Sequence, residues 1–171
     1  MKVLVTGYPG TGKSSVAREL KKRGHNAYDT EGMRGYMHAQ DIDTGEKIPI
    51  PTPVPRGWFD KVGNYNWDIP RIANLLASHE DVFLCSLADN QQILYDVFDF
   101  IFLLTLDDVE LENRLRSRMT TNYGKNSGEL SDIMTFHRRF EQSLLNLGAI
   151  EIKANRGIIE VTDEILSFTD R

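Results

Sequence analysis

Gly7-Tyr8-Pro9-Gly10-Thr11-Gly12-Lys13-Ser14 decides the fold, because it fits the pattern G-x-x-x-x-G-K-[ST] at every fixed position. Glycines allow backbone N–H groups to turn inward around a phosphate without a clash of Cβ atoms. The lysine of this pattern reaches the β- and γ-phosphates of a nucleotide, and the following hydroxyl binds Mg²⁺. The stretch therefore predicts an ATP-binding loop, whose nucleotide-binding residues are Gly7, Pro9, Gly10, Thr11, Gly12, Lys13, Ser14 and Ser15.

The segments on either side of this loop support the prediction. Residues 2–6 are apolar and β-branched, which is typical of a buried strand. Residues 13–23 carry Val16, Ala17 and Leu20 at helical spacing, and Gly24 follows where a helix often ends. A helix that begins at the loop directs the positive end of its dipole toward a bound phosphate.

Strands and helices alternate along the rest of the chain. Continuous apolar runs are typical of parallel strands that are covered on both faces. We therefore expect one α/β domain with the three-layer P-loop NTPase fold, in which a five-stranded parallel sheet has helices on both faces. The expected strands are residues 2–6, 26–28, 82–87, 100–104 and 149–152, and the expected helices are residues 13–23, 68–79, 107–118, 130–147 and 159–167.

Two segments depart from this alternation. Residues 32–66 contain four alternating prolines, from Pro49 to Pro55, and predict an irregular, partly extended insertion on a single domain of residues 1–171. The aromatic residues near its end either stack on an acceptor ring or anchor the loop; they are Trp58, Phe59, Tyr65 and Trp67. A polar, glycine-containing loop at about residues 118–128 is expected to form a lid.

Composition limits the possible partners. The 171 residues have a formal net charge of −5 and no long basic run, which disfavours a general nucleic-acid binder. No apolar stretch approaches the ~20 residues of a membrane span. The single cysteine, Cys85, lies in an apolar run and indicates a reducing compartment, so we expect a cytoplasmic protein that acts as a monomer or homodimer.

Three further stretches carry a resemblance to a known group. They are Tyr28-Asp29-Thr30-Glu31, the apolar run 100–104 with the following helix up to Arg118, and Asn155-Arg156-Gly157. With the phosphate loop, they make the chain resemble the small P-loop kinases, which include adenylate kinase, shikimate kinase and gluconate kinase. Glu31 replaces the second aspartate of the shikimate-type D-T-D element, and Ser86-Leu87-Ala88-Asp89-Asn90-Gln91 replaces its glycine triplet. The acceptor therefore need not be shikimate, gluconate or a nucleoside monophosphate.

The resemblance implies roles for individual residues. Lys13, Asp29, Arg118 and Arg114 are expected to be catalytic, the two arginines as lid residues that stabilise phosphate. Ser14 and Asp29 are expected at Mg²⁺, while Arg118, Asn155 and Arg156 join the nucleotide site. Because ligands of open α/β sheets bind beyond the carboxyl ends of the strands, we expect an acceptor site made by Asp29, Glu31, Arg34, Asp89, Asn90 and Gln91.

These residues favour an ATP-dependent kinase that phosphorylates a small polar molecule or a nucleotide. One alternative is a P-loop ATPase or switch that acts on a protein partner, with Asp107 and Asp108 as its acidic strand end. A binding module in which the nucleotide only stabilises a scaffold is the other alternative. The arginine-ending helix after Asp107 has a use only in the kinase, which is why we prefer that hypothesis.

Overall fold

Five parallel strands form the centre of the protein, as seen in a computed structural model that describes residues 1–119 and 121–169. Their order is β2-β6-β1-β7-β8, so the strand that precedes the phosphate loop lies in the middle of the sheet. The predicted three-layer α/β fold is thereby confirmed. The strands are β1 (Lys2–Thr6), β2 (Ala27–Asp29), β6 (Val82–Cys85), β7 (Phe100–Thr105) and β8 (Ile150–Lys153).

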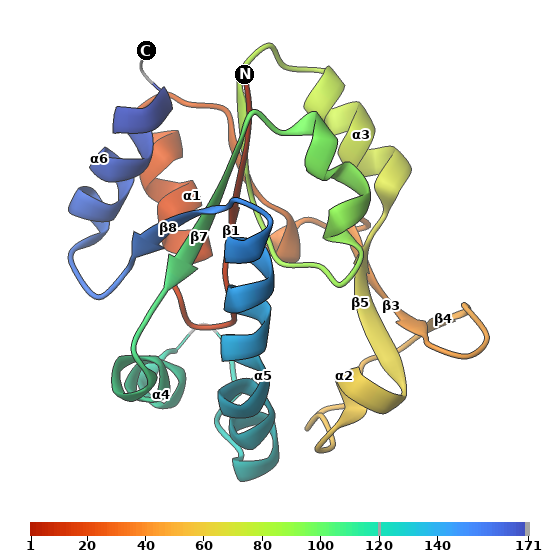
Figure 1. Ribbon diagram of the computed structural model, residues 1–171. Helices are drawn as coiled ribbons and strands as arrows, with labels where there is room; N and C mark the ends of the chain where they lie inside the picture. The colour runs from red at the N-terminus through yellow and green to blue at the C-terminus, as the bar shows by residue number, and fades with distance from the viewer. Residues whose placement is uncertain (120, 170–171) are drawn as a thin grey trace.

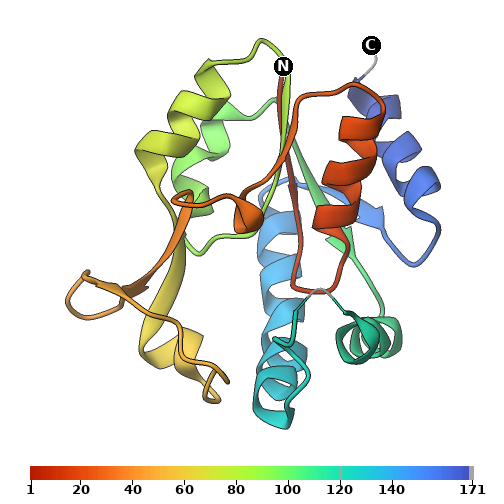
Figure 2. The same cartoon turned by 180° about the vertical axis from the view of Figure 1, so that it is seen from behind.

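Helices cover both faces of this sheet, as Figures 1 and 2 show from opposite sides. On one face, α1 and α6 pack their apolar side chains against β1, β6 and β7. On the other face, α3 packs against Leu4, Val82 and Leu84. The long helices are α1 (Lys13–Lys22), α3 (Ile69–Ala77), α4 (Asp108–Ser117), α5 (Ser127–Asn146) and α6 (Ile158–Thr169).

The carboxyl ends of the strands meet at one edge of the sheet, which lies at the bottom of Figure 1. The phosphate loop, α4 and the first turns of α5 gather at this edge. Cys85 is the last residue of β6, is fully buried and has a free thiol. It pairs in register with Asp29, the last residue of β2, so the polar residues that follow both strands emerge side by side.

Residues 37–67, which we call the arm, differ from the sequence prediction of an irregular insertion. They contain a three-stranded antiparallel sheet, in the order β4-β3-β5, and the short helix α2 (Trp58–Lys61). The strands are β3 (Met37–Asp41), β4 (Lys47–Ile48) and β5 (Gly63–Trp67). The proline-rich stretch lies outside helices and strands, between β4 and α2. In Figure 1 the arm projects from the lower right of the domain.

Two local features explain the arm's sheet. The Asp41 carboxylate accepts hydrogen bonds from the Asp43 and Thr44 amides at 3.0 and 2.8 Å, and Gly45 has a φ of 72°, so the chain turns sharply after β3. The Trp58 ring lies against Gly63, where a Cβ atom would be 2.4 Å from the ring. A strand can pass the indole closely only because that residue is a glycine.

Two shorter elements complete the chain, the 3₁₀ helices η1 (Thr30–Gly32) and η2 (Gln91–Val97). They follow β2 and β6 in places where the sequence predicted no helix. Over the described residues, none of the helices has the length and apolar character needed to cross a membrane.

Candidate nucleotide and acceptor site

The phosphate loop joins β1 to α1 and has the backbone of an anion cradle. Gly10 and Gly12 have φ angles of 98° and 105°, which side-chain-bearing residues rarely adopt. A Cβ atom at Gly7 would lie 2.6 Å from Thr11 Oγ1 and 2.7 Å from the Leu104 carbonyl oxygen. Only glycines fit these positions, and the first turn of α1 begins directly after them. Such a loop suits a phosphate group.

Lys13 is held beneath this cradle. The side chain is 6% exposed, and its Nζ donates a hydrogen bond of 2.8 Å to the Gly7 carbonyl oxygen. The same Nζ lies 3.3 Å from Glu31 Oε1. The ammonium group is therefore placed between the phosphate loop and the residues that follow β2.

Ser14 is the adjacent candidate for metal binding. It is exposed in the first turn of α1. Among the described residues, no group of three His, Cys, Asp or Glu side chains is arranged to hold a metal ion.

Asp29 and Glu31 lie at the end of β2 and in η1. Asp29 Oδ1 is buried and has no hydrogen-bond partner in the protein. A buried carboxylate oxygen without a donor is costly unless a ligand or water supplies one. The position of Asp29 is thus suited to accept a hydrogen bond from an acceptor hydroxyl.

Arg118 caps the end of α4 and approaches the same region. Its guanidinium donates to the Tyr123 carbonyl oxygen, while its Nε is buried without a partner. Burial lowers the pKa of Arg118, and the negative charge of Glu31 opposes that shift. Arg118 is therefore within the electrostatic influence of Glu31, the residue that pairs with Lys13.

The other two arginines of α4, Arg114 and Arg116, have different partners from Arg118. Arg114 donates from Nε to Glu110 Oε1 at 2.6 Å and from a terminal nitrogen to the Ala154 carbonyl at 2.7 Å. It thereby links α4 to the segment after β8, beside Gly12. Arg116 is exposed and pairs with Glu112 on the outer face of α4.

Three of the expected acceptor residues are already bonded to the protein. Asp89 Oδ2 accepts from the Tyr65 amide at 2.6 Å, and the Asn90 side chain bonds the Trp67 amide and carbonyl at 2.8 and 3.1 Å. The Gln91 side chain is 2% exposed and bonds Thr6, Ala88 and Tyr95. These residues attach the arm and η2 to the end of β6.

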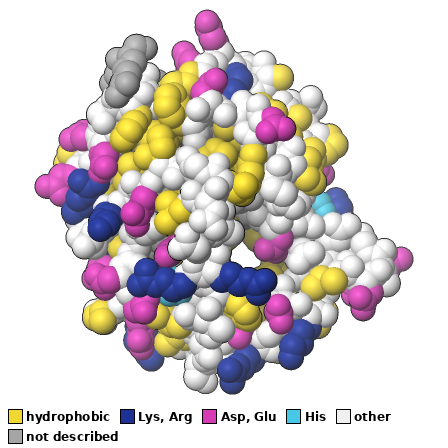
Figure 3. Space-filling model, in the orientation of Figure 1, with side chains coloured by type: hydrophobic (Ala, Val, Ile, Leu, Met, Phe, Trp, Pro, Cys, Tyr) yellow, Lys and Arg dark blue, Asp and Glu magenta, His cyan; other side chains and the backbone are white. Residues whose placement is uncertain are grey.

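Arg34 is exposed in the loop between η1 and β3. In the space-filling view, a hollow separates the arm from the rest of the molecule and has an acidic side chain at its rim (Figure 3). An acceptor bound between Asp29 and the arm would occupy this side of the sheet. The expected acceptor residues therefore divide into Asp29, Glu31 and Arg34, which remain candidates for direct contact, and a bonded set with a positioning role.

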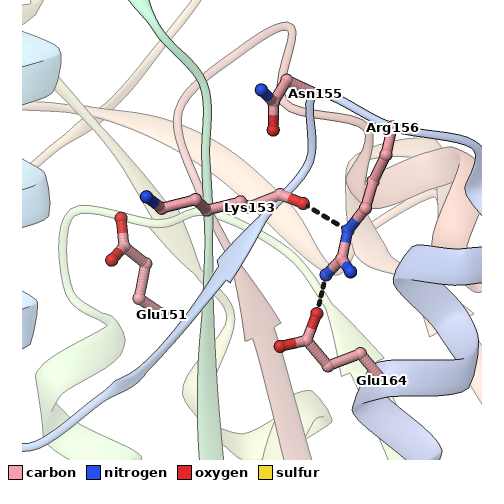
Figure 4. Close-up of a pocket in the computed structure, with 5 residues that line it drawn as sticks. All are labelled: Glu151, Lys153, Asn155, Arg156 and Glu164. Atoms are coloured by element: carbon pink, nitrogen blue, oxygen red, sulfur yellow. Dashed lines mark hydrogen bonds and ion pairs between the residues drawn. The ribbon is translucent and has the colours of Figure 1, made fainter.

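One cavity borders the other side of the phosphate loop, and a second cavity adjoins the first at Arg156. The first has a volume of about 190 Å³ and is lined by loop residues Thr11 and Gly12, by Arg114, and by apolar groups of α1 and α6. Arg156 lines it and also the neighbouring cavity of about 410 Å³, together with Asn155 (Figure 4). Arg156 Nε donates to the Lys153 carbonyl at 3.0 Å, and its guanidinium pairs with Glu164. Arg156, one of the two residues expected at the adenine base, thus shares a cavity with the loop, whereas Asn155 lines only the neighbouring cavity.

Three tyrosines lie near the site, of which the sequence singled out only Tyr65, as a residue that either stacks on an acceptor ring or anchors the insertion. The Tyr8 ring lies 5.6 Å from the Phe140 ring, and the Tyr123 ring lies 5.9 Å from the Phe59 ring. Burial raises the pKa of Tyr65, and the charges of Glu31 and Asp29 raise it further. Tyr8 occupies a variable position of the loop motif, and the sequence has no signal that places Tyr123 near the site.

Comparison with protein families identifies one match. The model of a family described as AAA domain (AAA_18) matches residues 3–135, which include the phosphate loop, Asp29 and Arg118. No curated protein matches the chain significantly.

Solved structures of small P-loop kinases have the same fold. A shikimate kinase from Acinetobacter baumannii in complex with shikimate has a TM-score of 0.60 and 15% identity, over 98% of this chain and 92% of that chain. Deoxyadenosine kinase from M. mycoides with bound dATP has a TM-score of 0.56 and 11% identity, over 100% of both chains. A gluconokinase from Sinorhizobium meliloti has a TM-score of 0.54 and 13% identity, over 97% of this chain and 89% of that chain. At these identities the likeness shows the fold.

Proposed function

The chain belongs to this AAA domain family, and on that premise we propose that it is an ATP-dependent kinase. It transfers the γ-phosphoryl group of ATP to a hydroxyl of a small polar acceptor. The observation that carries the proposal is the position of Lys13, whose Nζ lies between the Gly7 carbonyl of the phosphate loop and Glu31, two residues beyond Asp29. Phosphoryl transfer requires a cation at the transferred group and a polar residue at the acceptor hydroxyl, and Lys13 and Asp29 are suited to these two roles.

Each residue has a distinct role in this proposal. The glycine cradle binds the β-phosphate, and Lys13 leaves Glu31 to bind the β- and γ-phosphate oxygens. Mg²⁺, held by Ser14 and Asp29, would neutralise phosphate charge when bound. Arg118 stabilises the charge of the transferred group, and Arg114 with Arg156 borders the nucleotide on its far side. Asn155 lies beside the base.

Asp29 orients the acceptor hydroxyl and takes its proton as the new P–O bond forms. Its Oδ1 supports this role, because the oxygen is buried and no group of the protein donates a hydrogen bond to it. Glu31, once released by Lys13, and Arg34 complete the contacts with the acceptor. A nucleoside or another small polyol fits these groups, whereas the net charge of −5 disfavours a nucleic acid.

The geometry argues against the ATPase alternative. The Asp107 carboxylate accepts a 2.8 Å hydrogen bond from the Glu110 amide as the N-cap of α4. Asp108 Oδ1 lies 2.8 Å from Arg138 and 3.1 Å from His137 Nε2. Both carboxylates at the end of β7 therefore already have partners in the protein, which disfavours their use as magnesium ligands.

A screen of small hydroxyl compounds for acceptor-dependent ADP release tests the proposal. With the acceptor so identified, Asp29→Asn should bind ATP within about threefold of the wild type but lose transfer by about a hundredfold or more. Asp96→Asn, at an exposed position of η2, is the matched control and should transfer normally. Transfer by Asp29→Asn at the wild-type rate would contradict this placement of the acceptor. ATP hydrolysis that no compound stimulates would favour the ATPase.

A further inference from the structure

One buried carboxylate joins two segments that lie far apart in the sequence. Glu129, in the first turn of α5, is 4% exposed. Its Oε1 accepts from the Val54 amide at 2.9 Å, and its Oε2 accepts from the Gly124 amide at 2.7 Å. Val54 belongs to the arm, and Gly124 to the loop between α4 and α5, which we expect to act as the lid; Ser127 and Gly128, which the sequence placed in that loop, begin α5. We refer to these two hydrogen bonds as the clasp.

The lid side of the clasp leads directly to Arg118. Gly124 has a φ of 87°, and a Cβ atom there would lie 3.0 Å from Ile133 and 3.1 Å from Leu115. The residue is thus closely seated between α4 and α5. Its neighbour Tyr123 supplies the carbonyl oxygen that the Arg118 guanidinium contacts. Glu129 therefore fixes the backbone that holds the lid arginine.

The arm side of the clasp has independent support. The Gly57 amide donates to Asp132 Oδ2 at 2.5 Å, one helical turn along α5 from Glu129. Val54 packs with Trp58 in the arm's own small apolar cluster. The Phe59 ring of the arm meets the Tyr123 ring of the lid edge-on, at 5.9 Å and 89°. The proline-rich stretch is thus fastened to α5 and to the lid together.

We propose that Glu129 is a positioning residue that couples the arm to the lid, so that the two segments move together and acceptor binding brings Arg118 into place. The proposal rests on the proposed function, since Arg118 matters only for phosphoryl transfer. A carboxylate suits this role, because both of its oxygens accept hydrogen bonds and it has no donor to repel the two amides. Through the clasp, closure of the lid over ATP would depend on whether an acceptor is bound at the arm.

Amide hydrogen exchange at Val54 and Gly124, measured by NMR, tests the coupling without an acceptor. The nucleotide probe is adenylyl imidodiphosphate with Mg²⁺. In the wild type, the probe should slow exchange at both amides by the same factor. This result would be unexpected without coupling, because the probe binds at the phosphate loop and Val54 belongs to the arm. In Glu129→Gln, one side-chain oxygen becomes an NH₂ group, so at least one amide should exchange about tenfold to a hundredfold faster. The probe should then slow exchange at Gly124 alone.

A matched control separates coupling from general loosening. Asp132→Asn weakens the Gly57 contact and the ion pair with Arg56, and it should leave the shared response of Val54 and Gly124 intact. Calorimetry should give the same probe affinity, within about threefold, for wild type and Glu129→Gln. If circular dichroism shows that Glu129→Gln does not fold, Glu129→Asp replaces it, since the shorter side chain cannot span both amides.

Two results would overturn the coupling: wild-type protein in which the probe protects Gly124 but not Val54, or Glu129→Gln in which both amides still respond equally. Failure of the wild type to bind the probe would instead refute the proposed function. In that case, the coupling is judged by exchange without nucleotide. It stands if both amides exchange at the same rate after correction for intrinsic exchange, and it falls if their rates differ by more than about tenfold.

Discussion

The phosphate-loop edge of the sheet and the arm contribute to one candidate site but are stabilised in different ways. The loop follows a strand whose central residues Val3, Leu4 and Val5 are fully buried, and it lies between helices that share the main core. The arm has a separate apolar cluster in which only Ala39, Val54 and Trp58 are buried. Trp67, at the end of β5, anchors the arm in the core beside α3, and the other attachments are side-chain bonds to backbone amides, from Asp89, Asn90, Glu129 and Asp132.

This difference separates two tasks of a kinase. Phosphate binding requires a fixed geometry, and a large core holds the loop without help from ligands. Acceptor binding tolerates adjustment, and a segment with few buried contacts opens at lower free-energy cost than the core. In the proposed kinase, the nucleotide side would therefore be preformed, while the acceptor side could change its fit.

The largest effect should come from the preformed side. Lys13→Ala removes the buried ammonium group that contacts Gly7 and Glu31, and we expect turnover to fall at least a thousandfold. Lys22→Ala, at a side chain that is 78% exposed at the end of α1, is the control. Coupled-assay turnover and calorimetric ATP titration are the measurements. Unchanged affinity and turnover in Lys13→Ala would show that the loop is not an ATP site.

A somewhat smaller effect is expected at the junction of the two regions. Arg118→Ala should lower kcat about a hundredfold and change ATP affinity by less than about threefold, because the arginine acts mainly on the transferred group. Arg116→Ala, whose side chain is 57% exposed and pairs with Glu112, should behave like the wild type. Steady-state kinetics at saturating ATP separate the variants. A normal kcat in Arg118→Ala would reduce Arg118 to a structural role.

Stability measurements compare the two regions directly. Leu104→Ala, at a fully buried position of β7, should lower the free energy of unfolding by about 2–5 kcal/mol. Val54→Ala should lower it by under about 1 kcal/mol in urea unfolding, because the arm opens locally before the core unfolds. Proteolysis of residues 49–57 should nevertheless accelerate in Val54→Ala. Equal losses of global stability would show that arm and core unfold as one unit.

The smallest effect is expected at the strand end that an ATPase would use for Mg²⁺. Asp107→Asn should change stability by less than about 0.5 kcal/mol, because asparagine caps helices as well as aspartate does, and turnover should not change. Asp107→Ala should cost about 1 kcal/mol through loss of the cap. A severe loss of turnover in Asp107→Asn would indicate a metal ligand and revive the ATPase alternative.

The two regions also differ in how far the sequence predicts them. Gly7 to Ser14 forms a local pattern next to a buried strand, so the loop and the parallel sheet follow from neighbours in the chain. The arm's sheet pairs β3 with β5 across more than twenty intervening residues, and the apolar alternation of each strand is short, Met37 with Ala39 in β3 and Tyr65 with Trp67 in β5. The sequence therefore suggested an irregular segment, because nothing local specifies that pairing.

The same limit applies to side chains at the site. Asn90 and Gln91 follow a strand, as ligand-binding residues often do, but their polar atoms are bonded to Trp67, Thr6 and Tyr95. Glu129 is recognisable in the sequence only as an acidic residue near a helix start. Bonds between distant segments decide which polar groups are free to bind a ligand. The roles of Lys13, Asp29 and Arg118 stay predictions that the experiments above address.

Cys85 has a practical consequence. It is the only cysteine, it is fully buried at the end of the central sheet, and burial raises its thiol pKa far above neutrality. A thiol reagent should therefore modify the native protein only when the junction between β2 and β6 separates. The rate of modification, followed at increasing reagent concentration, would give the frequency of that opening. The same inert thiol allows a second cysteine to be introduced on the arm for selective labelling, with no need to replace the native residue.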